Sequence, residues 1–319
     1  MKTILEDNIS YETKIKDFGV DPVNKRIITT GDKLIFFKEG KIEKEVAGKI
    51  KNCEVIRYIK EKNQLFISSI FFVSTQSGKV YKCDGRRKKV IEEVYDFEKM
   101  PEVIDFTTGG KIIFIENNTL CSYDVNTKES YITQSFSENM TKGNYRIFTS
   151  GENVILKYRE LHEKSNRINI FDSKLEKIFD IKTENNHIYS KIIGIEYLAG
   201  TDAGEIEIWN ILESEMYNSV KISNSRITFI EKNERNYFIG TGTGDLIITD
   251  ETFKIQAIQN IFKNEIIKIC VTEDEIFVLG VENKIIKLKM IDETNEIKNN
   301  LQRMEFMEKY GIHLSLIHI

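Results

Sequence analysis

The chain has 319 residues, of which 40% are hydrophobic and 30% are charged. This composition supplies enough apolar side chains for a sizeable core and excludes a generally disordered protein. The 46 Lys and Arg residues face 50 Asp and Glu residues, giving a formal net charge of -4, so no global attraction to nucleic acid or to an anionic membrane is expected.

The N-terminal residues, MKTILEDNISYETK, carry charges early and lack the apolar segment of a signal peptide. No uninterrupted apolar run approaches the roughly 20 residues of a membrane-spanning helix. The four cysteines, Cys53, Cys83, Cys121 and Cys270, are widely spaced, with no CxxC pair. We therefore expect a cytoplasmic or nuclear protein with no membrane partner, no metal site, no cofactor, and reduced thiols that pack within strands.

Seven segments along the chain each show an apolar strand, a turn-rich break and a second apolar strand, which is the pattern of a β-hairpin. In chain order they are ITTGDKLIFFK, FFVSTQSGKVYKCD, IIFIENNTLCSYD, NVILKYRELHEKSNRINIFD, YLAGTDAGEIEIWN, YFIGTGTGDLIITD and FVLGVENKIIKLKM. The last three are the clearest, and their residues Gly200, Gly240 and Gly280 lie forty residues apart. Ser74 and Phe114 hold the corresponding positions in the second and third segments, again forty apart.

A forty-residue period of hairpins is typical of the four-stranded blades of a β-propeller. The sequence therefore predicts an all-β fold, a seven-bladed β-propeller of four-stranded antiparallel blades. The residue four places before the end of each hairpin tests the alignment, because it should face a packed neighbour. These residues are all aliphatic: Leu34, Val80, Leu120, Ile168, Ile206, Leu246 and Ile286. One boundary stays open, since QLFISS competes with IFFVS for the same strand of the second blade.

The fifth hairpin ends in IEIWN, residues 206–210, which resembles the closing strand of a WD repeat, where an aliphatic residue, a Trp and an Asp end the third strand. On this motif and the period, the chain resembles the WD-repeat family. It departs from that family because the Gly-His dipeptide is absent and most of the usual Asp, His, Ser and Trp hydrogen-bond network is missing.

Rings of this family commonly close by lending an N-terminal strand to the last blade. Here the chain turns polar after Met290, so the seventh blade lacks a fourth strand of its own, and residues 2–6 are free to supply it. We expect a propeller domain at residues 1–290 and a polar tail at 291–319. In the tail, Ile297, Leu301 and Met304 fall on one face of a short C-terminal helix, which we expect to pack on the propeller itself rather than on a partner.

Two groups of residues are candidates for binding a partner or RNA. The first is a basic run after the Asp84-Gly85 turn between the third and fourth strands of the second blade, and it consists of Arg86, Arg87, Lys88 and Lys89. A solvated loop is the alternative reading of this run. The second is the lengthened hairpin loop of the fourth blade, on the opposite face of the ring, which contains Lys157, Tyr158, Arg159, His162 and Lys164. A tolerated insertion is equally consistent with this loop.

Catalytic motifs are not evident. The four histidines are scattered, and no HExxH, P-loop or nucleophile elbow is present. The glycines of GTGTGD lie within a hairpin, and the pairs Glu205 with Glu207 and Asp202 with Asp245 read as solvated strand or turn acids. We therefore expect a non-catalytic protein-interaction scaffold, a subunit of a multiprotein complex. The alternatives are an RNA-associated accessory subunit, for example the propeller partner of a tRNA methyltransferase, and a propeller enzyme acting on a small molecule in the central channel.

Overall fold

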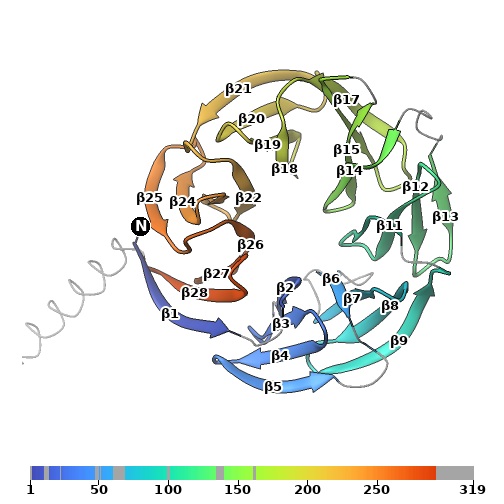
Figure 1. The fold of residues 1–319 in the computed structure, drawn as a ribbon, viewed down its shortest axis with the longest axis vertical. Helices are drawn as coiled ribbons and strands as arrows, with labels where there is room; N and C mark the ends of the chain where they lie inside the picture. Colours follow the sequence, from blue (N-terminus) through green and yellow to red (C-terminus); the bar gives the residue numbers. More distant parts are fainter. Residues whose placement is uncertain are drawn as a thin grey trace, which may run out of the picture.

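Seven four-stranded sheets surround a common axis in the computed structural model (Figure 1). The structure describes residues 2–10, 14–21, 23–46, 50, 52–59, 69–98, 101–133, 140–160 and 163–291. Within each sheet, neighbouring strands pair antiparallel, with the first strand of the blade nearest the axis and the fourth on the outside. The predicted all-β, seven-bladed β-propeller is confirmed.

The blades follow one another in chain order. Blade 1 is β2 (Asp17–Val20), β3 (Ile27–Thr30), β4 (Leu34–Lys38) and β5 (Lys41–Val46). Blade 2 is β6 (Cys53–Tyr58), β7 (Ile70–Thr75), β8 (Lys79–Asp84) and β9 (Lys89–Asp96). Blade 3 is β10 (Ile104–Phe106), β11 (Lys111–Glu116), β12 (Thr119–Asp124) and β13 (Ser130–Ile132). Blade 4 is β14 (Met140–Ser150), β15 (Asn153–Glu160), β16 (Asn166–Phe171) and β17 (Lys177–Thr183).

The remaining blades repeat this order. Blade 5 is β18 (His187–Ile193), β19 (Glu196–Thr201), β20 (Glu205–Asn210) and β21 (Glu215–Lys221). Blade 6 is β22 (Ile227–Lys232), β23 (Asn236–Thr241), β24 (Asp245–Asp250) and β25 (Ile255–Asn260). Blade 7 is β26 (Ile266–Val271), β27 (Glu275–Gly280), β28 (Lys284–Ile291) and β1 (Lys2–Ser10). The IFFVS alternative for the second blade is therefore the one realised, in β7.

The N-terminal strand closes the ring, as predicted. β1 pairs antiparallel with β28 from Lys2 opposite Ile291 to Ser10 opposite Lys284, and it forms the outer strand of blade 7 in Figure 1. The pairing runs beyond residues 2–6 because Ile9 also turns inward, where it is 3% exposed and packs with Phe277 of blade 7 and Phe37 of blade 1. The predicted C-terminal helix and tail, from residue 292 onward, lie outside the described residues.

The core lies between the blades. The aliphatic residues that test the alignment are all buried: Leu34, Val80, Leu120, Ile168, Ile206, Leu246 and Ile286. They belong to clusters that span adjacent blades; Ile206 of blade 5, for example, packs with Ile227 and Ile239 of blade 6. Since burial of apolar area contributes about 25 cal/mol per Å², this sheet-on-sheet packing stabilises the ring throughout.

Two glycine turns explain part of the sequence pattern. Gly204 and Gly244 follow β19 and β23 with φ of +82° and +83°, a backbone region that side chains disfavour. A Cβ atom at Gly244 would lie 2.2 Å from the carbonyl oxygen of Phe262, so only glycine fits this turn. The reading of GTGTGD as part of a hairpin is confirmed, because the segment joins β23 to β24.

All four cysteines are free thiols, and Cys53, Cys83 and Cys121 are buried. Burial raises the pKa of Cys53 to about 12 and the pKa of Cys121 and Cys270 to about 11. Their thiols are therefore protonated at neutral pH and pack as small apolar groups. Within the described part of the chain, no His, Cys, Asp and Glu side chains cluster as a metal site would require. Nor does any helix there have the length and apolarity to cross a membrane.

Closure by β1 can be tested with two substitutions on that strand. Ile9→Ala should lower the free energy of unfolding by about 2 to 4 kcal/mol, because it leaves a cavity against blades 7 and 1. Leu5→Ala is the matched control: Leu5 is 58% exposed on the same strand, and its loss should change stability by no more than about 0.5 kcal/mol. Denaturant unfolding of both variants checks the prediction, and equal stabilities would contradict it.

Candidate functional site

The ring has two faces, defined by the ends of the strands. We call the CD face the one that carries the turns between third and fourth strands, such as residues 85–88 of blade 2 and 211–214 of blade 5. The BC face carries the connections between second and third strands, such as residues 163–165 of blade 4 and 202–204 of blade 5. The first strand of each blade begins at the BC face, as the hydrogen bond from Asp202 N to Asn186 O shows in blade 5.

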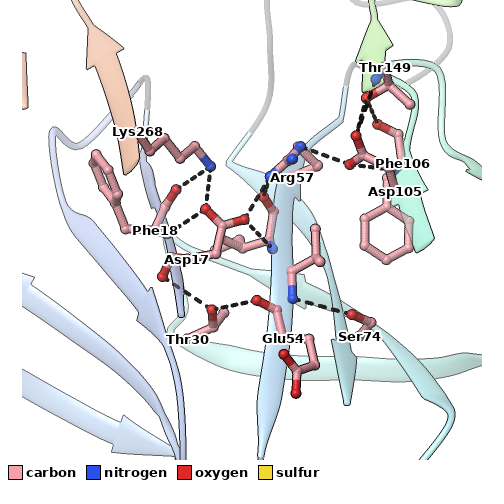
Figure 2. A network of polar contacts seen from close by, with 12 residues as sticks. Asp17, Phe18, Thr30, Glu54, Arg57, Ser74, Asp105, Phe106, Thr149 and Lys268 are labelled. Atoms are coloured by element: carbon pink, nitrogen blue, oxygen red, sulfur yellow. Dashed lines mark hydrogen bonds and ion pairs between the residues drawn. The ribbon is translucent and has the colours of Figure 1, made fainter. Parts of the chain in front are cut away.

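A chain of polar contacts joins the inner strands of five successive blades (Figure 2). Lys268 of blade 7 donates to Asp17 Oδ1 of blade 1 at 2.6 Å, and Arg57 of blade 2 donates to Asp17 Oδ2 at 2.7 Å. Arg57 Nε also lies 3.0 Å from Asp105 Oδ1 of blade 3. On its other side, Asp105 Oδ2 accepts hydrogen bonds from the amide and hydroxyl of Thr149 in blade 4. Arg57 thus holds two carboxylates from two other blades.

The circuit continues around the rest of the channel. Ser150 of blade 4 donates to the carbonyl of Ile192 in blade 5 at 2.8 Å. Lys191 of blade 5 pairs with Glu231 of blade 6, and Thr228 of blade 6 donates to the carbonyl of Ile266 in blade 7. Side-chain contacts therefore connect every inner strand to the next. We call this closed circuit the channel belt: Asp17, Arg57, Asp105, Thr149, Ser150, Lys191, Thr228, Glu231 and Lys268.

The charges of the channel belt compensate one another. Burial alone would raise the pKa of the Asp17 carboxyl, but the charges of Lys268 and Arg57 and the hydrogen bonds to it outweigh burial and lower that pKa. Burial would lower the pKa of Arg57, but Asp105 and Asp17 raise it instead. Each ionic side chain of the belt thus has a partner of opposite charge within the belt. These ion pairs connect neighbouring blades.

A second buried network lies in blade 5. Glu207 is 1% exposed and accepts hydrogen bonds from Trp209 Nε1 at 3.1 Å and, at 2.9 Å, from the ring of His187. The other ring nitrogen of His187 contacts Tyr197, which also bonds Ser190. The expectation that Glu207 is a solvated strand acid is therefore wrong, because His187 and Trp209 provide the partners that a buried carboxylate needs.

The basic run lies on the CD face, where the sequence places it. The β8–β9 turn carries Arg86, Arg87 and Lys88, and Lys89 begins β9. Arg86, Arg87 and Lys89 are exposed. Arg87 lies 3.7 Å from Asp84, and Lys88 pairs with Glu43 of blade 1. Two of the four cations are thus already opposite carboxylates of this chain.

The blade 4 candidates do not form the predicted loop. Lys157, Tyr158 and Arg159 belong to β15, which extends to Glu160. Both Lys157 and Tyr158 are buried. Tyr158 packs with Tyr145 on the side facing blade 3, whereas Lys157 contacts Asn186 and His187 on the side facing blade 5. Arg159 is exposed at the BC face, and Lys164 is exposed in the connection to β16. His162 lies outside the described residues. The placement of this segment opposite the basic run is confirmed.

An exposed apolar patch on the CD face of blade 5 was not foreseen from the sequence. We call it the blade 5 patch, and its apolar members are Ile195, Leu212, Met216 and Tyr217, which are 54%, 77%, 47% and 56% exposed. The hydrogen bond from Ile211 N to Ile195 O joins its two turns. Glu196 and Glu213 border a hollow there together with Ile195, Asn210 and Tyr217. The sequence signal that could have revealed the patch is the pair Met216 and Tyr217 in EMYN. These apolar residues stand at the start of an outer strand, where polar residues are expected on both sides.

Comparison with known proteins adds the fold and nothing narrower. No protein-family model matches the chain, and no curated protein matches it in sequence. Solved structures do match, among them the crystal structure of the computationally designed Ika8 protein, with a TM-score of 0.65 over 88% of this chain and 98% of that chain. The two sequences are 10% identical, so the likeness concerns fold alone. The class defined by strand order and closure is the seven-bladed β-propeller.

The contribution of the channel belt can be measured at Asp17. Asp17→Asn should lower the free energy of unfolding at pH 7 by about 3 kcal/mol, because Lys268 and Arg57 lose a charged partner. Since the pKa of Asp17 is lowered on folding, its stabilisation is present above the unfolded-state pKa and is lost as the pH falls through the folded-state value. The difference in the free energy of unfolding between the wild-type protein and Asp17→Asn should therefore become smaller below about pH 4.

Asp274→Asn is the control for this measurement. Asp274 pairs with Lys25 at 3.5 Å with both side chains about half exposed, so its loss should cost less than about 1 kcal/mol. Urea unfolding of the three proteins between pH 7 and pH 3 provides the data. A deficit for Asp17→Asn that is as large at pH 3 as at pH 7 would contradict the assignment.

Proposed function

We propose that this chain is a non-catalytic protein-interaction scaffold, a subunit of a multiprotein complex. The observation that carries the proposal is the blade 5 patch. Its side chains come from two turns and an outer strand whose backbones are fixed by the sheet. Several exposed apolar side chains on a rigid support are typical of a protein-binding site.

The composition of the patch indicates the chemistry of the partner segment. Leu212 is 77% exposed and therefore offers most of its apolar surface to a partner. Glu196 and Glu213 line the hollow beside it, and Glu215 is exposed next to them. A segment with apolar side chains flanked by Lys or Arg would complement this surface in both shape and charge.

The channel belt favours a scaffold over an enzyme that acts in the channel. An active site there would need polar groups free to meet a substrate, whereas Asp17, Asp105 and Glu231 each pair with a cation of a neighbouring blade. The belt instead keeps the blades in fixed relation. A rigid ring presents its loops in a constant arrangement, which lowers the entropic cost of binding.

We also propose that the ring is of the WD-repeat type. Trp209 of the IEIWN strand donates to Glu207, which in turn contacts His187, so blade 5 contains a network of His, Trp and acid side chains of the kind that the resemblance implies. Closure by β1 is consistent with the same assignment.

An RNA-associated role rests on the basic run alone and is the weaker proposal. Arg86 and Lys89 are exposed, whereas Lys88 pairs with Glu43 and Arg87 lies near Asp84. The charge available to a phosphate backbone is therefore smaller than the sequence indicates. The cytoplasmic or nuclear location stays a prediction.

Purification of the tagged protein from its native extract, with and without RNase, tests these functions. We expect a stable set of protein partners that survives RNase and is lost in the double variant Leu212→Ser, Tyr217→Ser. Ile258→Ser is the matched control, because Ile258 is 60% exposed on the outer strand of blade 6 and lies outside the patch. If the partners still co-purify with the double variant, the blade 5 patch is not their binding site. Partners lost with RNase and with Arg86→Ala, Lys89→Ala would favour the RNA role.

A further inference from the structure

Three cations gather on the side of blade 4 that faces blade 5, near the BC face. Successive side chains of a strand alternate between its two sides. Phe148 and Ile155 pack against the blade 5 residues Ile192 and Tyr197. Arg146 and Lys157 lie two residues closer to the BC face than Phe148 and Ile155 do, on the same side of the sheet. They are opposite each other in the β14–β15 register, and Arg159 follows Lys157 on that side of β15. The apolar interface between the blades therefore ends in a cluster of positive charge.

Lys157 is the buried member of the cluster. It is 8% exposed, and its Nζ donates to Asn186 Oδ1 at 2.6 Å and to the carbonyl oxygen of His187 at 2.7 Å. Both acceptors are neutral. Burial and the nearby charges of Arg146 and Arg159 lower the pKa of Lys157 to about 8, although Asp202 acts in the opposite direction. The ammonium is held in place by these two neutral acceptors, and no carboxylate of the described residues is in contact with it.

The two arginines of the cluster, unlike Lys157, are open to solvent. Arg146 and Arg159 are exposed, and Arg146 makes one long contact of 3.4 Å to the carbonyl of Ile188. Among the residues that the structure describes, no carboxylate lies within 4.0 Å of a cationic nitrogen of this cluster. Glu163, from the β15–β16 connection, is paired with Lys182 instead. Like charges opposite each other on paired strands are destabilising, so an anion here would relieve repulsion.

We infer that Arg146, Lys157 and Arg159 form a binding site for a phosphate monoester. Two guanidinium groups can each donate a pair of parallel hydrogen bonds to phosphate oxygens. A monoester carries close to two negative charges at pH 7, concentrated on one group, which suits three cations at one place. The linking phosphates of RNA carry one charge each and are spread along a strand, so they suit an extended basic surface better.

The phosphate can come from a phosphorylated side chain of a protein or from a free small anion. The cluster lies on the BC face, whereas the blade 5 patch lies on the CD face. The inference therefore does not depend on the proposed function, and Leu212→Ser, Tyr217→Ser should leave phosphate binding intact.

Isothermal titration of the whole protein tests the site with four probes: inorganic phosphate, a short phosphoserine peptide, the same peptide unphosphorylated, and a single-stranded RNA octamer. We expect the first two to bind and the unphosphorylated peptide not to bind. Tighter binding of the phosphopeptide than of inorganic phosphate identifies a modified protein as the source, and equal binding identifies a free anion.

Variants of exposed residues keep the test independent of folding. Arg146→Gln and Arg159→Gln should each weaken phosphate binding by about tenfold, since each removes a charged hydrogen-bond donor. Arg235→Gln, in an exposed turn of blade 6 on the CD face, should have no effect. Asp202→Asn should strengthen binding, a gain that unfolding cannot produce.

Three results would overturn the inference. The wild-type protein could fail to bind both inorganic phosphate and the phosphopeptide at millimolar concentration. The Arg146→Gln and Arg159→Gln variants could bind phosphate as tightly as the wild-type protein does. The RNA octamer could bind more tightly than the phosphopeptide and be lost in the same variants, which would assign the cluster to phosphodiesters instead.

Discussion

The contact of Arg57 with Asp17 and Asp105 is the interaction on which the arrangement of the ring most depends. One guanidinium from blade 2 meets a carboxylate from blade 1 and another from blade 3. Lys268 extends this set to blade 7 and Thr149 extends it to blade 4. Apolar packing between sheets is strong but non-directional, whereas charged hydrogen bonds require defined geometry. The channel belt therefore supplies the orientation that the apolar clusters do not.

Structural and binding roles fall to different parts of this ring, which the channel belt holds at its centre and β1 closes at its edge. The polar groups of the channel belt and of the blade 5 network, such as Glu207 with His187, have partners within the chain. The two surfaces that we assign to ligands lie on opposite faces of the ring. The apolar and acidic blade 5 patch is on one face, and the cluster of Arg146, Lys157 and Arg159 is on the other. The two surfaces differ in chemistry, so the ring is suited to hold two different ligands at once.

The sequence predicts the fold well because the fold depends on local periodicity. The forty-residue spacing and the aliphatic residue before the end of each hairpin reflect packing that every blade repeats, and closure follows from the missing fourth strand of blade 7. The channel belt could not be predicted in this way, because Lys268 and Asp17 are 251 residues apart and occupy unrelated positions in their blades. Lys157 was misplaced for a related reason: a polar residue in a lengthened segment resembles a loop until its partners on blade 5 are known.

A thermodynamic cycle on Arg57 and Asp105 tests most directly whether the belt fixes the blades. The free energies of unfolding of Arg57→Gln, Asp105→Asn, the double variant and the wild-type protein give the coupling between the two side chains. The account predicts a coupling energy of about 1 to 3 kcal/mol, with the double variant losing less than the sum of the two single variants. Strictly additive losses would contradict it, because they would mean that the contact between blades 2 and 3 contributes nothing to holding the ring together.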